Sequence, residues 1–386
     1  MYQAESGSES AERTCAYLRM WLTPGLGVRG AGRIMGAIGD PRKIELLSHR
    51  DLTHLGLADD VAHMLQSTDS IKRADEEWHR AIALGARIID IDDPEYPPLL
   101  REISDPPLVL YVRGQLPAAA EPYIAIVGSR HPSPYGINCA SRISRDLAER
   151  GVIVVSGLAR GIDTAVHQGA LAAGTTVGVL GTGVDRAYPS ENEALADSMA
   201  KKGALMSEFP LGTLPLPQNF QRRNRILAGL ALGTLVVEAA ERSGSLITAR
   251  LALEANREVF AIPGPIQSLK SRGCHQLIQQ GACLVTGWED IARELSPRVQ
   301  LIRPTLPEVT IRDDNTSDIR SNKVLTPGQR RLLAAVSVSE DITLDTLSAK
   351  TSTPPSELYS AILALELLGF VRKLPGDRYI RNDPPP

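Results

Sequence analysis

Three loops of the chain combine glycine, serine and arginine in a way that suits phosphate binding. The first lies in YIAIVGSRHPSPYG, residues 123–136, where an apolar run ends at Gly128, Ser129 and Arg130 just before a helical pattern. A strand that ends in glycine before a helix presents backbone amides to an anion. Because Ser129 adds a hydroxyl and Arg130 a planar guanidinium, the loop predicts a phosphate site.

Two later segments, SGLARGID and ERSGSLITA, repeat these residue types at the start of further helical patterns. Their candidate phosphate ligands are Ser156, Gly157, Arg160 and Gly161 in the first and Ser243, Gly244, Ser245 and Thr248 in the second. A single loop of this kind says little, because glycine also serves simply to turn the chain. Three of them at one sheet edge indicate an extended, polyanionic ligand.

The segment NFQRRNRILAGL, residues 219–230, concentrates positive charge before an apolar helical run. Arg222, Arg223 and Arg225 lie within four residues, with no carboxylate between them and Phe220 beside them. From residue 219 to residue 272 there are eight Lys or Arg against four Asp or Glu, a local charge of +4 (8 − 4). A solvated basic helix face is the alternative. Since neutralised phosphates release counterions, the patch predicts salt-dependent nucleic-acid binding.

The same loops exclude a dinucleotide cofactor. The Gly128 turn has one glycine before the helix instead of G-x-G-x-x-G, and the next strand ends in Ser156-Gly157 instead of an acidic residue. The chain also lacks the G-x-x-x-x-G-K-[ST] motif of a nucleotide-binding P-loop. We therefore expect no cofactor, and a polyanion remains as the ligand.

Few residues near the predicted ligand edge suit catalysis. Asp163 fits a helix cap as well as an acid or base, and Glu238 fits a partner of an arginine as well as a catalyst. His131 and His167 lie near the same edge, where an isolated histidine more often makes a structural hydrogen bond. The chain has neither G-x-S-x-G nor H-E-x-x-H, so we expect a binding protein and not an enzyme.

Composition places the chain in a broad class without naming its function. The 386 residues carry a net charge of −3 and 4% aromatic residues, so any basic surface must be local. The four cysteines form no C-x-x-C pair, which disfavours a metal site or a disulfide framework and suits a reducing cytoplasm. With neither a signal-peptide core nor an apolar run of about 18 residues, we expect a cytoplasmic protein and no membrane span.

Alternating apolar runs and helical patterns predict an α/β core with a Rossmann-like, mostly parallel sheet. The predicted strands are 86–91, 108–112, 124–127, 153–155, 176–180, 204–206, 234–237, 259–262 and 283–285, with helices at 135–150, 163–173 and 245–256 among them. The carboxyl ends of such strands form the ligand face. The predicted domains are a helical unit at 1–85, the core at 86–296, a linker at 297–325 and a winged helix at 326–386.

Both flanking units have a possible nucleic-acid role and a plainer alternative. The Gly25-Leu26-Gly27 turn resembles a helix-hairpin-helix turn, but a small helical packing domain is the favoured interpretation. In the winged helix the groove-entering helix, 355–368, carries Glu357 and Glu366 and neither Lys nor Arg. Carboxylates are repelled by phosphates, so an accessory or partner-binding role is favoured over reading of double-stranded DNA.

The order of the motifs resembles that of the DNA-processing protein A family (DprA, also called Smf). The resemblance is dense from about residue 90 to 290 and rests on IAIVGSR, VVSGLARGIDTAVHQGAL, TVGVLGTGVDRAYPSEN, RRNRILAGL, VVEAAERSGSLITARLALEANREVFAIPG and GCHQLIQQGA. It implies a core that binds single-stranded DNA without sequence preference. It also implies protection of incoming strands, loading of the RecA recombinase during natural transformation, and a homodimer.

Carried onto this sequence, the resemblance makes Arg130 a phosphate contact and places the arginines of RRNR in the same groove, bordered by 243–248 and Lys270. The full predicted DNA-binding set is Gly128, Ser129, Arg130, Ser156, Gly157, Arg160, Gly161, Asn192, Arg222, Arg223, Asn224, Arg225, Ser243, Gly244, Ser245, Thr248 and Lys270. Three positions depart from the family pattern: Ser190 where many members have lysine, Gln221 in place of proline, and His275 in place of asparagine.

Two other functions remain open on the sequence. A nucleotide-processing enzyme related to the lysine-decarboxylase-like phosphoribohydrolases would share the core fold. Its P-G-G-x-G-T-x-x-E signature has only the partial counterpart RSGSLITARLALE, which lacks the double glycine. A transcription factor that acts through the winged helix is disfavoured by the acidic helix at 355–368.

Overall fold

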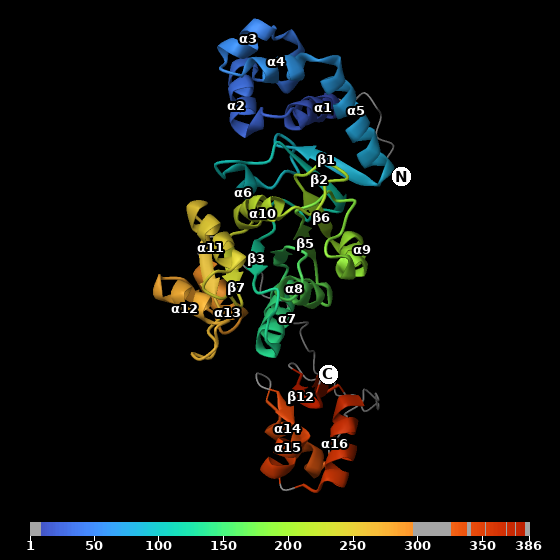
Figure 1. Cartoon of the computed structure of the whole chain (residues 1–386), viewed down its shortest axis with the longest axis vertical. Helices are drawn as coiled ribbons and strands as arrows, with labels where there is room; N and C mark the ends of the chain where they lie inside the picture. Colours follow the sequence, from blue (N-terminus) through green and yellow to red (C-terminus); the bar gives the residue numbers. More distant parts are fainter. Residues whose placement is uncertain are drawn as a thin grey trace, which may run out of the picture.

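The structure, a computed structural model, describes residues 9–295, 326–337, 341–351, 353–367, 369–374 and 376–382 (Figure 1). Its centre is a nine-stranded sheet in the order β1-β2-β6-β5-β4-β3-β7-β8-β9. The strands are β1 (Ala86–Asp90), β2 (Val109–Gly114), β3 (Tyr123–Val127), β4 (Ile153–Ser156), β5 (Thr176–Val179), β6 (Ala204–Ser207), β7 (Gly233–Val236), β8 (Glu258–Ala261) and β9 (Cys283–Leu284). All nine predicted strands are confirmed.

Seven neighbouring strands, from β6 through β3 to β9, run parallel, which confirms the Rossmann-like core. The edge formed by β1 and β2 is antiparallel, both between those two strands and between β2 and β6. The sequence did not indicate this reversal, because apolar strand patterns carry no direction. From β3 the chain builds β4, β5 and β6 on one side and then crosses to β7 on the other. This reversal opens a crevice beyond the ends of β3 and β7.

Helices cover both faces of the parallel strands, and the alternation along β3 shows which face each covers. Ala125 and Val127 pack with α10 and α11, whereas Ile124 and Ile126 pack with α7, α8 and α13. These helices, with α9 and α12, are α7 (Pro134–Ala148), α8 (Ile162–Leu171), α9 (Glu193–Lys202), α10 (Pro217–Leu230), α11 (Gly244–Glu254), α12 (Arg272–Gln279) and α13 (Trp288–Leu295). The tight packing fixes the helix ends that approach the crevice.

The N-terminal helices pack onto the antiparallel edge of the sheet (Figure 1). They are α1 (Glu9–Leu22), α2 (Gly27–Ile38), a 3-10 turn (Pro41–Leu46), α3 (His49–His54), α4 (Asp59–Gln66) and α5 (Thr68–Ala83), and α6 (Pro98–Arg101) follows β1. Their core residues Leu18 and Leu65 belong to one cluster with Val109 and Tyr111 of β2. Gly25 and Gly27 both have positive φ, which makes the turn between α1 and α2 possible.

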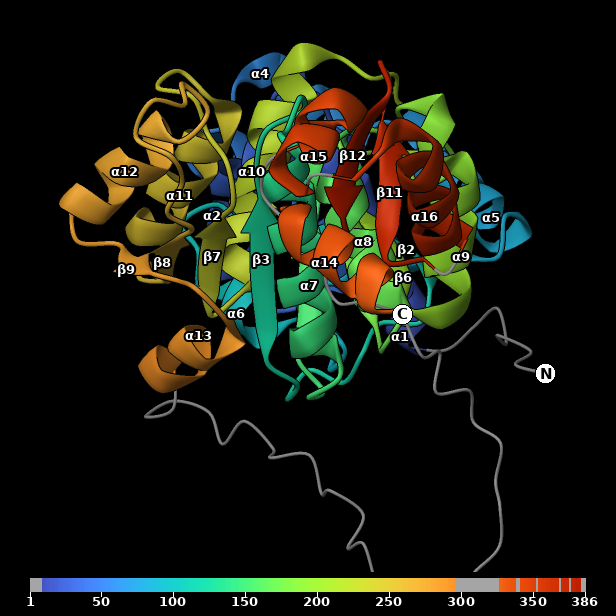
Figure 2. The same cartoon turned by 90° about the horizontal axis from the view of Figure 1, so that it is seen from below.

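The C-terminal unit has three helices and a small antiparallel sheet, as predicted for a winged helix. Its elements are α14 (Pro327–Ala335), β10 (Ile342–Thr343), α15 (Leu344–Thr351), α16 (Pro355–Leu367), β11 (Val371–Leu374) and β12 (Arg378–Arg381). The wing strands β11 and β12 lie between α15 and α16 in the view of Figure 2. Leu347, Leu358 and Leu365 form a core within this unit. The predicted linker, 297–325, lies outside the described residues.

None of the described helices combines the length and the apolar character that a bilayer crossing requires.

Candidate nucleic-acid interface

The crevice beyond β3 and β7 is a groove of about 890 Å³. Eight members of the predicted DNA-binding set line it: Gly128, Arg130, Arg223, Asn224, Ser243, Gly244, Ser245 and Thr248. They come from the loop after β3, from α10 and from the N-terminus of α11. A smaller cavity of about 70 Å³ adjoins the groove and shares Arg130, Arg223 and Phe220 with it. The structure thus brings two of the three predicted loops and the arginine segment to one site.

The loop after β3 and the loop before α8 lock together by close backbone contact. Ile162 N donates to Ser129 O at 3.1 Å. A Cβ on Gly161, where φ is +83°, would lie 2.5 Å from Ser129 O, and one on Gly128 would lie 2.6 Å from Ile162 Cγ1. Only glycine fits at either position, so both glycines shape the groove wall through backbone geometry.

The N-terminus of α11 supplies oriented backbone amides on the opposite side of the groove. Ser243 is its N-cap residue, and its hydroxyl accepts a hydrogen bond from Ser245 N at 3.2 Å. Gly244 is exposed in the first turn and leaves room for close approach to the helix end. The remaining free amides and the helix dipole favour an anion at this position.

Arg130 is exposed at the mouth of the groove beside two aromatic rings. Its guanidinium carbon lies 5.8 Å from the centroid of the Phe220 ring. Phe220 in turn lies 5.6 Å from Tyr188, centroid to centroid, at a tilted angle. Within the described part of the chain Arg130 forms no ion pair. A cation and two π faces therefore stand together, which suits a phosphate and the bases attached to it.

Arg223 is 6% exposed and holds the floor of the groove. Its Nη1 donates to Val179 O at the end of β5, and its Nε has no partner among the described residues. Burial lowers the pKa of Arg223 to about 10, and the nearby Asp163 carboxylate opposes this shift. A Cβ on Gly157 would lie 2.2 Å from Asp163 Oδ2 and 2.6 Å from Arg223 Nη1, so glycine makes room for both charges.

The structure separates Arg222 and Arg225 from Arg223, against the expectation that all three line one groove. Glu208, which directly follows β6, is fully buried; it accepts a hydrogen bond from Arg225 Nη2 at 2.6 Å and forms an ion pair with Arg222 Nη2 at 3.0 Å. Arg225 also pairs with Asp105 at 3.2 Å. Successive helical positions point about 100° apart, so neighbours in RRNR face different surroundings. Arg222 and Arg225 anchor α10 to the sheet.

Most of the remaining predicted residues support the loops from outside the groove lining. The Ser156 hydroxyl donates to Ile126 O at 2.6 Å, and Asn192 Nδ2 donates to Leu158 O at 2.9 Å. Arg160 lines the small cavity and pairs with Glu191, its neighbour from the loop that carries Ser190. Lys270 is half-buried on the loop after β8 and does not line the groove. Their contact with DNA stays a prediction.

Two groove arginines were not singled out from the sequence. Arg242 precedes the Ser243 cap, and Arg250 lies two turns along α11, where it pairs with Glu254 at 3.5 Å. Both are exposed. The signal for Arg242 was its place beside a predicted phosphate loop, whereas Arg250 needed the direction of α11 to be known. With Arg130 and Arg223, they give the lining four arginines against the two carboxylates Asp163 and Glu241.

The candidate catalytic residues have structural partners. Glu238 accepts hydrogen bonds from the backbone N and the hydroxyl of Ser133, the N-cap residue of α7. Asp163 Oδ2, in the first turn of α8, accepts from Ala159 N at 3.2 Å and so ties the preceding loop to the helix. His167 is fully buried, and its Nε2 donates to Gly157 O at 2.8 Å. These contacts give each residue a role in holding the groove loops.

The burial of His167 should make the stability of the fold sensitive to acid. Burial lowers its pKa to about 4, below the value of about 6.5 in an unfolded chain. Between these values the unfolded state binds a proton and the folded state does not, so the free energy of unfolding falls as the pH falls from about 6.5 to 4. We expect the titration of His167 to lower the free energy of unfolding by about 3 kcal/mol between pH ~6.5 and ~4. Above pH ~7 it should cause no change.

The measurement is urea unfolding of the wild type and of His167→Gln between pH 4 and 8. The variant loses the titration while keeping a polar side chain, so the difference between the two stability curves should narrow toward pH 4. Parallel curves across the window would contradict the role given to His167.

Comparison with known proteins agrees with this architecture. The family described as DNA recombination-mediator protein A matches residues 87–296, and the DprA winged helix domain matches residues 319–377. Protein Smf of Escherichia coli (strain K12) is 43% identical over 297 residues, which cover 76% of this chain and 77% of the relative. DNA processing protein DprA of Bacillus subtilis (strain 168) is 44% identical over 57% of this chain and 75% of its own length.

A solved structure extends the agreement to three dimensions. The X-ray structure of DNA processing protein A from Streptococcus pneumoniae has a TM-score of 0.64 and 34% sequence identity, and the match covers 73% of this chain and 97% of that chain. The resemblance carried by the sequence motifs is thereby confirmed for residues 87–296 of the core and for residues 319–377 of the winged helix. The chain belongs to the DNA recombination-mediator protein A family.

Proposed function

We propose that the chain binds single-stranded DNA in the groove beyond β3 and β7 and serves as a recombination mediator. The observation that carries the proposal is the lining of this groove, in which four arginines, the N-terminus of α11 and the Phe220–Tyr188 pair stand together. Arginines and backbone amides hold phosphates without reading base sequence. Binding is therefore expected to be independent of sequence and dependent on salt.

The aromatic pair favours a single strand over a duplex. Phe220 and Tyr188 line the groove as a pair of tilted rings, and unpaired bases stack on aromatic side chains. In a duplex the bases already stack on one another, so this contribution is lost. The phosphate contacts alone would hold both forms.

A binding role is favoured over catalysis by the contacts of the polar residues in the groove wall. Glu238 is engaged by Ser133, Asp163 by Ala159, and His167 lies beneath the Gly157 carbonyl. The one hydroxyl–carboxylate pair among these contacts, Ser133 with Glu238, also holds the backbone amides of Ser133 and Gly136 at the start of α7, which is a capping role. The proposal accordingly includes no chemical step.

The partners are proposed from family membership. A recombination mediator must give up its strand, and a RecA recombinase is the proposed recipient, with a homodimer as the acting form. The winged helix is proposed as an accessory unit, because Glu357, Tyr359 and Leu363 are exposed on α16. An acidic and apolar helix surface suits a protein partner better than a phosphate backbone.

The test compares a labelled ~30-mer single strand with its duplex over a salt series by fluorescence anisotropy. We expect tighter binding of the single strand and a linear fall of log K with log salt, with a slope of about −2 to −3 for three or four phosphate contacts. Equal affinity for both forms would contradict the proposal. Incubation with nucleoside monophosphates is the parallel assay, in which release of a free base would favour a phosphoribohydrolase instead.

A further inference from the structure

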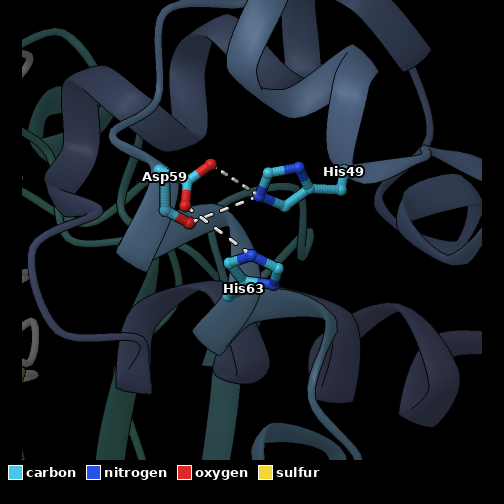
Figure 3. Close-up of side chains that lie close together, drawn as sticks. All are labelled: His49, Asp59 and His63. Carbon is cyan, nitrogen blue, oxygen red and sulfur yellow. Dashed lines mark hydrogen bonds and ion pairs between the residues drawn. The ribbon is translucent and has the colours of Figure 1, made fainter.

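His49, Asp59 and His63 converge on the surface of the N-terminal helical unit (Figure 3), and none of them lines the groove. His49 is the first residue of α3, Asp59 is the first residue of α4, and His63 follows Asp59 by one helical turn. Each offers one ligand atom, and the three atoms lie within 4.8 Å of one another. It is the one such trio found in the part of the chain that the structure describes.

The distances within this trio suit a small cation. Asp59 Oδ1 lies 3.2 Å from His49 Nε2, and Asp59 Oδ2 lies 3.6 Å from His63 Nε2. Two ligand atoms bound to a tetrahedral zinc ion at about 2.0–2.1 Å lie roughly 3.3 Å apart. The two imidazole rings are stacked, with centroids 4.0 Å apart and a 31° tilt, so both nitrogens approach the carboxylate from the same side.

The backbone fixes two of the three ligand positions. The spacing of Asp59 and His63 is i,i+4, which puts both on one helix face, as for the paired histidines of H-E-x-x-H zinc sites. The start of α3 is fixed by a capping box between Ser48 and Asp51. Leu52 of α3 and Leu65 of α4 are fully buried, which anchors both helices.

The side chains of the trio are exposed enough to move into position around a cation. The His63 and Asp59 side chains are 69% and 75% exposed, whereas that of His49 is 32% exposed. His63 can therefore rotate toward the other two, and water can fill the fourth position. Nothing buried has to move.

A histidine–aspartate pair on α5 shows what is particular to this trio. His79 also lies one turn after an aspartate, Asp75, with Nδ1 3.4 Å from the carboxylate. It is an ordinary surface pair with one imidazole, and such pairs contribute little to stability. At His49, Asp59 and His63 a second imidazole from another helix reaches the same carboxylate. The trio therefore brings together two imidazole nitrogens and a carboxylate, whereas the His79 pair offers one imidazole and one carboxylate.

We propose that His49, Asp59 and His63 form a binding site for a divalent transition ion of the zinc class. Two imidazoles and one carboxylate are borderline donors, which suit Zn²⁺, Co²⁺, Ni²⁺ and Cu²⁺ and not the oxygen-preferring Mg²⁺ or Ca²⁺. The ion replaces the protons shared between the imidazoles and Asp59, and it links the starts of α3 and α4. Its expected effect is to stabilise the helical unit without entering the groove.

The test is zinc titration of the full, tag-free chain by calorimetry after treatment with a chelator. We expect one Zn²⁺ per chain and a rise in Tm with zinc. His63→Ala and Asp59→Asn should each weaken zinc binding roughly 100-fold or more, since loss even of supporting groups around a metal costs 10–100-fold. His79→Ala is the matched control and should bind zinc as the wild type does.

Cobalt is a second probe, because its absorption spectrum distinguishes binding at this site from binding at a cysteine thiolate. Bound Co²⁺ should give weak visible bands without the intense near-ultraviolet band of a cobalt thiolate. The absence of saturable binding, equal binding in all variants, or a thiolate band would each overturn the proposal. Affinity for single-stranded DNA should be the same in His63→Ala and in the wild type.

Discussion

Replacing both Arg130 and Arg242 with alanine is expected to weaken single-stranded DNA binding roughly 100-fold, because each lost charge-assisted contact contributes at least ~1.5 kcal/mol. Both side chains are exposed and line the groove, and neither forms an ion pair within the described part of the chain. Their full charge is therefore available to phosphates. The slope of log K against log salt should become shallower by roughly 1.4, at 0.7 for each lost phosphate contact.

Anisotropy titrations at three or more salt concentrations measure both quantities. The matched control is Arg87→Ala with Arg293→Ala, which removes two exposed arginines that do not line the groove. If the control lowers affinity as much as the groove variant does, the effect is one of net charge and the assigned interface is wrong. Arg223 is left intact because its burial would mix a folding defect with a binding defect.

Glu208→Ala is expected to reduce the free energy of unfolding by about 3 kcal/mol, since it removes the buried partner of Arg225 and leaves that guanidinium only the half-exposed Asp105. The Glu208 carboxylate is fully buried between Arg222 and Arg225, and Arg225 is itself 13% exposed. Burial raises the pKa of Glu208, and the two arginines oppose the rise. The Glu208 backbone carbonyl also accepts from Trp21 Nε1 at 2.8 Å, so the same residue joins α1 to the sheet.

Urea unfolding of the variant, followed by circular dichroism, gives the measurement. Glu95→Ala removes the exposed partner of Arg87 and should change stability by under ~1 kcal/mol. A similar loss in both variants would show that Glu208 is not the buried anchor described above. Because α10 carries Phe220 and Arg223, surviving Glu208→Ala protein should also bind DNA more weakly.

The strands and the ligand edge could be predicted because their signals are local. Each of the nine strands is a short apolar run, and burial on both faces makes such runs continuous. Glycine and serine at the ends of β3 and before α11 marked the groove loops without any knowledge of topology. The reversal of β1 and β2 had no comparable signal, since an apolar run reads the same in either direction.

The sequence could not predict which arginines line the groove and which pair with carboxylates, because this depends on contacts between distant segments. In the sequence, RRNR has no carboxylate beside it, yet Glu208 and Asp105 reach Arg222 and Arg225 from other elements. The convergence of His49 with Asp59 and His63 likewise depends on how α3 meets α4. Residue spacing cannot supply such partners, and a count of local charge overstates the free positive charge.

The interlocked glycines of the groove wall have a consequence for the thermodynamics of association. Because Gly161 and Gly128 leave no space between the two loops, we expect the wall to keep its shape when a ligand binds. A preorganised receptor loses little conformational entropy on binding. The ordering entropy of binding is then expected to come mainly from the DNA strand, so a stiffer strand should bind at a smaller entropic cost.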